Sequence, residues 1–279
     1  MPRLLRIGIA SLVLALLAGG AWLAFHHSAG PRFQGRTPQQ WFEQCAQSVQ
    51  SDGTIQDAAA VRAVVGFGEQ SVPCLVSGLL RRKGAFADDW NRMRSRLPAA
   101  TTNVVPRQLE VREAWQRTWA AHEIIAAAPL ELKRAVARAA VPRLLAEVRN
   151  PKTEDRSYRL TFMQVLEPEP GLVVADLNQF LADPDLMVRQ AAAGFLLRYG
   201  TAAQPAMGNL LHLVTNGEPN TIHARAFAIQ ALGGIGPEAK PAVPVLLGLL
   251  THSNSNLWFA ASNSLSQIAP ELVPRGGSK

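Results

Sequence analysis

Residues 235–244 read IGPEAKPAVP, and their pattern of a glycine, four residues and a proline occurs at two other places in the chain. The three copies are Gly68–Pro73, Gly200–Pro205 and Gly236–Pro241, and the last two lie 36 residues apart. Glycine permits the left-handed backbone that ends a helix, and proline is tolerated in the first turn of the next helix. The pattern therefore predicts helix pairs repeated along the chain. A repeat of this length is typical of an α-solenoid, in which each pair buries its apolar face against its neighbours.

The repeat extends into the flanking helices, where four residues recur at the same offset of 36. A shorter copy, residues 261–270, aligns with residues 228–237 and lacks a second helix, as expected of a terminal unit. Further helices are predicted over residues 107–127 and 132–148, and the sequence VPRLL at 141–145 echoes VPVLL at 243–247. We therefore expect the solenoid to cover residues 56–270. The recurring residues are Ala192, Leu196, Gly200 and Pro205, matched by Ala228, Leu232, Gly236 and Pro241.

Two segments of the sequence resemble a known repeat family. Asp183-Pro184-Asp185, followed by Val188-Arg189 and Ala191-Ala192, opens a helix, and residues 235–244 join two helices. Both resemble HEAT repeats, strongly over residues 183–270. The resemblance implies an all-α fold, a right-handed α-solenoid of HEAT-like helix pairs, with a binding role. Residues 33–41 (FQGRTPQQW) are similar to the segment that precedes the repeats in bacterial membrane-anchored or secreted HEAT-repeat proteins.

The first residues predict export. A short basic segment, residues 1–6, precedes nineteen uncharged residues, IGIASLVLALLAGGAWLAF, at positions 7–25. As a helix this run would be about 28 Å long, close to the thickness of the hydrocarbon core of a bilayer. We predict a transmembrane or signal-anchor helix. A cleaved signal peptide with a site at Ser28-Ala29-Gly30 is the alternative, and the protein would then be secreted or periplasmic.

The charges beside this run bear on its orientation. Arg3 and Arg6 favour a cytoplasmic N-terminus, whereas Arg32 and Arg36 oppose it. Because the leading charges lie closer to the apolar run, we expect a single-pass membrane protein with its solenoid outside the cytoplasm.

Residues 26–55 are predicted to form a tether and a lead-in helix. Thr37 can cap this helix, Pro38 suits its first position, and Gln40 stands at the reciprocal position of a capping box. Asp52-Gly53 is expected to end it. Its apolar stripe consists of Trp41, Phe42, Cys45 and Val49.

A basic insertion at residues 84–106 interrupts the repeats, and a basic tail follows at residues 271–279. The formal charge of the chain is +7. Around the insertion we predict a basic patch that contacts anionic lipid or an acidic protein. Trp90, Trp115 and Trp119 also suggest stacking on nucleic acid, which an exported protein would rarely meet. A solvated polar insertion is the remaining interpretation. The patch consists of Arg81, Arg82, Lys83, Arg92, Arg94 and Arg96.

The sequence contains few candidates for catalytic or metal-binding residues. The di-iron hydroxylases of HEAT-like fold need several His-Glu pairs, and this chain has one, His122-Glu123. No phosphate-binding loop or nucleophile motif is present, and Gly233–Gly236 is better explained as a helix end. Cys45 and Cys74 are expected in the core, with one disulfide as the alternative. We therefore expect no cofactor, no metal and no enzymatic activity; a HEAT-like enzyme or lyase acting on a small ligand or nucleic acid is the alternative.

The predicted function is a non-catalytic scaffold or adaptor that binds another protein. Stacked repeats curve, and we expect the second helices of the pairs to line the resulting groove. Helical phase gives seven candidate contact positions: Arg143, Glu147, Gln179, His212, Thr215, Thr251 and His252.

Overall fold

The computed structural model describes residues 30–80, 109–153, 155–216 and 221–272. These residues form an all-α fold, in which α-helices alternate with short 3₁₀ segments and the only β-pairing consists of isolated bridges. The predicted all-α class is therefore confirmed. The predicted anchor at residues 7–25, the basic insertion at 84–106 and residues 273–279 of the tail lie outside the described ranges.

The lead-in helix α2 (Pro38–Gln47) begins as the sequence predicts. Thr37 Oγ1 accepts a hydrogen bond from the Gln40 amide at 3.3 Å, and Gln40 Oε1 accepts one from the Thr37 amide at 2.9 Å. The helix ends at Gln47, earlier than the predicted Asp52-Gly53, because Val49 leaves the helix and pairs with Ile55 across a turn.

Three helices pack around α2, and a fourth packs on one of those three. Helix α3 (Ala58–Gly66) is capped by Asp57, whose carboxylate accepts from the Ala60 amide at 2.9 Å. The 3₁₀ segment η1 (Gly68–Ser71) leads into α4 (Val72–Leu80), and Gly68 takes the positive φ that the repeated pattern requires. Helix α7 (Leu109–Ala126) packs on α2 and α4, and α8 (Leu130–Arg149) packs on α4.

Residues 141–145 of α8 resemble residues 243–247 in sequence, but the prolines of the two segments take different places in their helices. Pro244 stands in the first turn of a helix, but Pro142 lies inside the twenty-residue α8. Pro142 is exposed. Its ring therefore projects into solvent, and the surrounding turns stay helical because the side chains on the opposite face, such as Val141 and Leu145, are buried.

The remaining elements form pairs of similar size. They are α9 (Arg156–Met163), η2 (Gln164–Leu166), α10 (Pro170–Phe180), α11 (Leu186–Leu196), η3 (Leu197–Ala206), α12 (Met207–Thr215), α13 (Ile222–Ile235), η4 (Gly236–Ala242), α14 (Val243–Leu249), α15 (Ser255–Ile268) and η5 (Pro270–Leu272).

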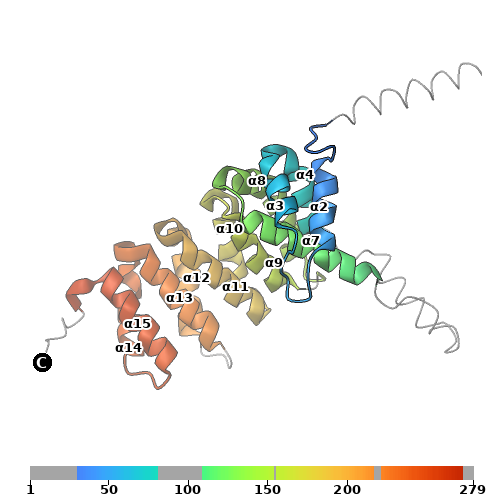
Figure 1. Ribbon diagram of the computed structural model, residues 1–279. Coiled ribbons are helices and arrows are strands. Elements are labelled where there is room, and N and C mark those ends of the chain that lie inside the picture. Colours follow the sequence, from blue (N-terminus) through green and yellow to red (C-terminus); the bar gives the residue numbers. More distant parts are fainter. Residues whose placement is uncertain (1–29, 81–108, 154, 217–220, 273–279) are drawn as a thin grey trace, which may run out of the picture.

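These pairs stand in two rows (Figure 1). In the first row α9, α11, α13 and α15 each pack on the next, and in the second row α8, α10, α12 and α14 each pack on a first-row helix. Small residues allow the close approach: Gly233 of α13 lies so near Ser264 of α15 that an added Cβ would come within 2.6 Å of its Oγ. The result is an elongated array with α2 and α15 at opposite ends (Figure 1).

Among residues 30–80, 109–153, 155–216 and 221–272, no single helix has the length and apolar character needed to cross a bilayer, and the bent pair Ala58–Gly66 with Gly68–Leu80 meets those criteria only jointly.

Candidate functional site

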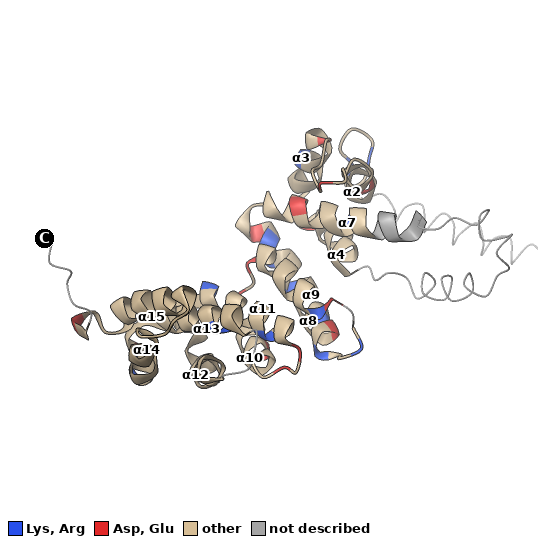
Figure 2. Cartoon of the chain, turned by 90° about the horizontal axis from the view of Figure 1, so that it is seen from below, with Lys and Arg blue, Asp and Glu red and all other residues tan. Residues whose placement is uncertain are grey.

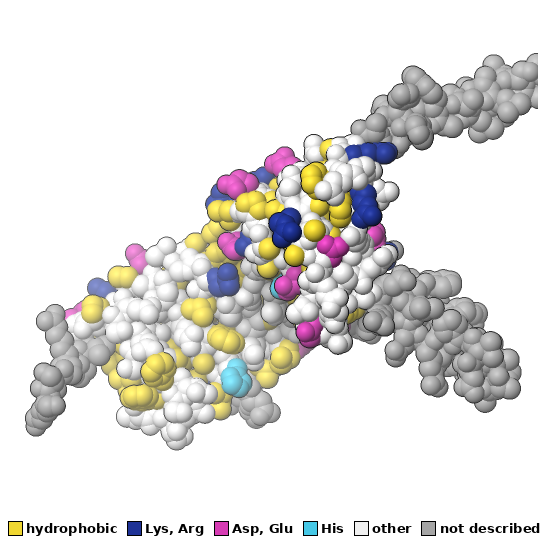
Figure 3. Space-filling view, in the orientation of Figure 1, with side chains coloured by type: hydrophobic (Ala, Val, Ile, Leu, Met, Phe, Trp, Pro, Cys, Tyr) yellow, Lys and Arg dark blue, Asp and Glu magenta, His cyan; other side chains and the backbone are white. Residues whose placement is uncertain are grey.

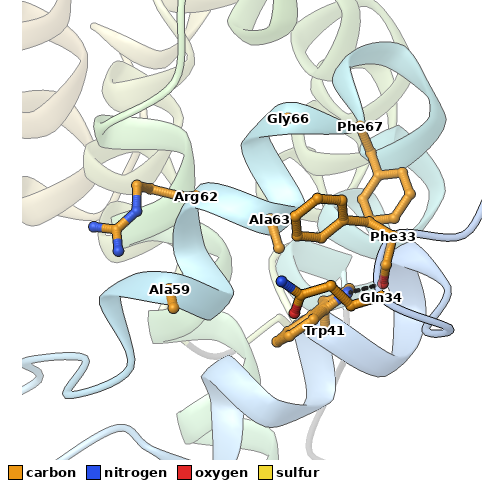
Figure 4. A pocket seen from close by; sticks show the side chains of 8 residues that line it. All are labelled: Phe33, Gln34, Trp41, Ala59, Arg62, Ala63, Gly66 and Phe67. Carbon is orange, nitrogen blue, oxygen red and sulfur yellow. Dashed lines mark hydrogen bonds between the residues drawn. The ribbon is translucent and has the colours of Figure 1, made fainter.

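A cavity of about 530 Å³ opens beside α2 and α3, and we call it the N-terminal pocket (Figure 4). Aromatic side chains from three segments form its walls, and none of the lining residues is acidic. It is lined by Phe33, Gln34, Trp41, Ala59, Arg62, Ala63, Gly66 and Phe67.

A tight turn before α2 places one wall of this pocket. The backbones of Phe33 and Arg36 exchange hydrogen bonds of 3.0 and 3.1 Å, and Gln34 and Gly35 both have positive φ. Two consecutive positive φ angles are typical of a type I′ turn. The Phe33 carbonyl also accepts from Trp41 Nε1 at 3.1 Å, so the turn is fixed to α2. The Phe33 ring is 51% exposed, above the opening of the pocket.

Arg62 lines this pocket, and Arg36 lies over the ring of Trp41, another lining residue; the two arginines differ in their partners. The guanidinium of Arg36 stands 4.8 Å from the ring centroid of Trp41 and donates to the side-chain oxygen of Gln44. Gln44 donates in turn to Asp57, and the Ala60 amide and this side chain together lower the pKa of the Asp57 carboxyl. In the described parts of the chain, the Arg62 guanidinium has neither an ion pair nor a hydrogen bond.

A second cavity, of about 420 Å³, lies across the first row of helices, and we call it the central pocket. None of its lining residues is charged. Its walls combine aromatic rings and a methionine with hydroxyl and amide groups, which can each donate and accept hydrogen bonds. It is lined by Ser157, Tyr158, Thr161, Gln164, Met187, Gln190, Ala191, Gly194 and Phe227.

An aromatic cluster connects the central pocket to α7. Tyr158 lies 4.4 Å from Phe162 between ring centroids, and Phe162 lies 4.5 Å from His122 and 5.8 Å from Trp119. Trp119 stacks on Trp115 at 5.8 Å. His122 is therefore half-buried among rings, because the contact between α7 and α9 encloses it. The sequence does not predict this surrounding, since it does not reveal which helices meet.

Charge is scarce over the helices beyond the central pocket. In residues 207–216 and 221–272 the Lys, Arg, Asp and Glu side chains are Arg225, Glu238, Lys240 and Glu271. Figure 2 shows α12, α14 and α15 almost without blue or red. In the view of Figure 3, charged side chains gather over the end that carries α2, whereas hydrophobic and uncharged polar side chains cover most of the other end.

We call the outer surface of the first row the uncharged face, and define it by Tyr158, Met187, Gln190, Phe227 and Phe259. The first four line the central pocket. Phe259 is 59% exposed. Its place in α15 corresponds to that of Gln190 in α11, because each lies two residues before an aligned alanine of its repeat, Ala261 and Ala192. The scarcity of charge after residue 206 is a sequence signal that would have pointed to the part of this surface around Phe227 and Phe259, but not to Tyr158, Met187 and Gln190.

The seven predicted contact residues lie on second-row elements, and neither pocket is lined by any of them. Arg143 and Glu147 are on α8, Gln179 is on α10, and His212 and Thr215 are on α12. Thr251 and His252 follow α14.

Several of these side chains already have partners. Glu147 pairs with Arg159 of α9 at 2.6 Å. His252 Nδ1 accepts from the Asn254 amide at 3.0 Å, ahead of α15, and Thr215 donates to the His212 carbonyl at 3.0 Å. Arg143, Gln179 and His212 are exposed. Contact with a partner stays a prediction for all seven.

The other predicted sites divide between described and undescribed residues. The basic patch of Arg81, Arg82, Lys83, Arg92, Arg94 and Arg96 lies outside the described ranges. Of the tryptophans expected beside it, Trp115 is 38% exposed and Trp119 is half-buried. Cys45 and Cys74 are buried and present as free thiols. Burial raises the pKa of each thiol to about 12. Within the described residues, no three His, Cys, Asp or Glu side chains are grouped so as to hold a metal ion.

Several solved structures are similar to the chain, among them one engineered protein. No protein-family model matches the chain, and no curated protein matches it. The chain is similar to the crystal structure of an engineered protein from the Northeast Structural Genomics Consortium, with 18% sequence identity and a TM-score of 0.42. The likeness covers 81% of this chain and 96% of the engineered one.

Proposed function

We propose that this protein is a non-catalytic scaffold, a right-handed α-solenoid of HEAT-like helix pairs that binds another protein and is tethered to the membrane by residues 7–25. The two-row arrangement supports the solenoid, because every pair packs mainly on its neighbours along the chain. The pattern of basic residues followed by an uncharged run supports a tether with the solenoid outside the cytoplasm.

The observation that carries the binding role is the composition of the uncharged face. The centres of protein–protein interfaces are poor in charged residues and rich in aromatic residues and methionine. Met187 is 54% exposed and Tyr158 is 46% exposed, at the rim of a cavity large enough to receive a side chain. An extended apolar surface of this kind on a soluble domain marks an interaction site.

The charge of the face defines the kind of partner. The chain as a whole carries +7, so an acidic partner would be drawn to its charged end and not to this face. We therefore assign the face to a protein that presents uncharged apolar side chains, one of which enters the central pocket. Binding driven by apolar contact depends little on ionic strength, unlike binding between opposite charges.

Two measurements test the tethered scaffold. In the first, a reporter active only outside the cytoplasm is fused to Lys279, and the cells are fractionated. Activity in the membrane fraction supports the tether, activity in the soluble fraction means that the first segment is cleaved, and a silent membrane-bound fusion would place the solenoid in the cytoplasm.

In the second, a photo-reactive side chain is placed at Met187 of the uncharged face or at Arg143 of the second row. We expect one discrete crosslinked protein from Met187. That protein, identified and purified, should bind the parent protein with an affinity nearly independent of salt and bind the Phe227→Ala variant about tenfold more weakly. A partner crosslinked from Arg143 alone, or bound equally by Phe227→Ala, would move the site to the second helices.

A further inference from the structure

The N-terminal pocket has an aromatic end and an end that carries an arginine. Figure 4 places the rings of Phe33 and Phe67 together at one end, with Trp41 beneath. The exposed Arg62 lies at the other end, and its guanidinium is directed away from the rings. The aromatic end offers an apolar surface to a ligand. Arg62 offers a guanidinium, whose fork of donors matches the oxygens of a phosphate or carboxylate. A ligand that fills both ends is an anion with an apolar body.

No other described residue pairs with the Arg62 guanidinium or covers the Phe33 ring. The Arg62 guanidinium has no partner among the described residues, whereas that of Arg36 lies over the Trp41 ring and donates to Gln44. The Phe33 ring remains half exposed, although its backbone is held by the Trp41 indole. The turn therefore presents an apolar ring at the mouth of an apolar cavity without covering it.

The position of the pocket in the chain indicates where its ligand comes from. Phe33 follows Phe25, the last residue of the uncharged run, by eight residues. Even a fully extended chain would cover at most about 28 Å over that distance. If residues 7–25 cross a membrane, the pocket stands within reach of the headgroups of the adjacent leaflet.

We propose that the N-terminal pocket binds one anionic phospholipid of that leaflet, with its phosphate on Arg62 and the upper part of an acyl chain between Phe33, Trp41 and Phe67. The inference rests on the proposed membrane tether. It assigns to the tethered end a second attachment, which would hold α2 and α3 against the membrane and fix the direction in which the array leaves it.

The test uses the full chain reconstituted in nanodiscs that contain equal amounts of phosphatidylglycerol and phosphatidylcholine. A photo-reactive side chain replaces Gln34, which lines the pocket, and the mass of the intact protein after irradiation identifies the lipid attached. The same replacement at Gln70, an exposed residue outside the lining, controls for lipid that merely surrounds the protein. We expect adducts of phosphatidylglycerol to predominate at Gln34 but not at Gln70.

Two substitutions in this background complete the test. Arg62→Gln should reduce the preference for phosphatidylglycerol about tenfold, the change expected from loss of one charge-assisted hydrogen bond. Arg138→Gln, on the exposed surface of α8, should leave the preference unchanged. Equal labelling by both lipids at Gln34, or an unchanged preference in Arg62→Gln, would overturn the proposal.

The outcome is separable from that of the proposed function. Reconstitution places the full chain at a bilayer whatever its location in the cell, so a reporter result against the tether does not alter the lipid adducts. Conversely, the protein partner is detected at Met187, on elements that do not border the N-terminal pocket.

Discussion

Arg156 and Asp183 form a buried ion pair that ties the first turn of α9 to the turn ahead of α11. Arg156 Nη1 donates to Asp183 Oδ1 at 3.0 Å and Nη2 donates to Oδ2 at 2.5 Å, while Nε donates to the Val148 carbonyl. Both side chains are only 9% exposed. Arg225 makes a similar backbone contact two pairs later, from a different position in its helix: its Nε donates to the Val214 carbonyl at 2.9 Å and so connects α13 to α12.

Breaking this pair should destabilise the protein strongly. Asp183→Asn leaves the guanidinium buried without its counter-charge, and loss of one partner of a buried pair costs about 3–5 kcal/mol. Urea unfolding followed by circular dichroism measures the change. The control is Asp176→Asn, which removes the ion-pair partner of Arg149. Because the Arg149 side chain is 52% exposed, this change should lower the free energy of unfolding far less. Equal losses in the two variants would contradict a structural role for the Arg156–Asp183 pair.

Gly236→Val should also destabilise the C-terminal pairs. Gly236 ends α13 with φ 81° and ψ −146°, a region that only glycine adopts readily, and the strain is worth about 1–3 kcal/mol. The matched control is Gly248→Ala in α14, where an added Cβ meets nothing within 4 Å. That change should be neutral or slightly stabilising. Thermal melting compares the two, and a parental melting temperature for Gly236→Val would mean that the turn between α13 and α14 is wrongly placed.

Side chains of the uncharged face should contribute little to folding. Met187 and Phe195 both belong to α11, but Met187 is 54% exposed and Phe195 is 1% exposed. We expect Met187→Ala to change the free energy of unfolding by at most about 0.5 kcal/mol and Phe195→Ala to lower it by about 3–5 kcal/mol. Chemical denaturation of the two variants measures this contrast. A large loss in Met187→Ala would show that the residue serves the fold and not a partner.

The two thiols should be unreactive in the folded protein. Desolvation is the main cause that raises the pKa of Cys45 and Cys74 to about 12 from an ordinary value of 9.0, and the thiolate is the reactive form. A disulfide-exchange reagent at pH 8 should label neither residue until urea is added. Rapid labelling of the native protein would contradict their burial. Failure to label even in urea without reductant would show that they have formed the disulfide.

The same shift sets a dependence of stability on pH. Because the folded-state pKa is raised, the unfolded chain loses its thiol protons first as the pH rises. The stabilisation from keeping the thiols neutral is complete below about pH 9 and is lost between pH 9 and 12. Replacing both cysteines by alanine should remove this component of the alkaline destabilisation, measured by urea unfolding across that range.

Local signals in the sequence predicted most of the helix boundaries. Thr37 and Gln40 are three residues apart and form the predicted capping box, and Gly236 ends α13 because its conformation depends on the residue itself. The end of α2 was missed, since the bridge between Val49 and Ile55 depends on how the loop folds back. The helix predicted over residues 132–148 runs through Pro142, and α8 does so, because the packing of its other face keeps the turns around the proline helical.

The candidate sites needed information that no local pattern contains. Met187 and Phe227 are forty residues apart and line one pocket only because α11 packs on α13. Phe33 and Arg62 line one pocket because of the turn before α2 and the orientation of α3. Helical phase alone pointed to the second helices, as the phase indicates which side of a helix is exposed but not which exposed sides adjoin one another.

The order in which the helices contact one another has a mechanical consequence. A pull between α2 and α15 would pass through α7, α4, α8, α9, α11 and α13, since each of these helices packs on the next. The compliances of interfaces loaded in series add, so a small tilt at each would sum to a large displacement of the far end. The array would therefore yield under load as a spring does, while its individual helices stay intact.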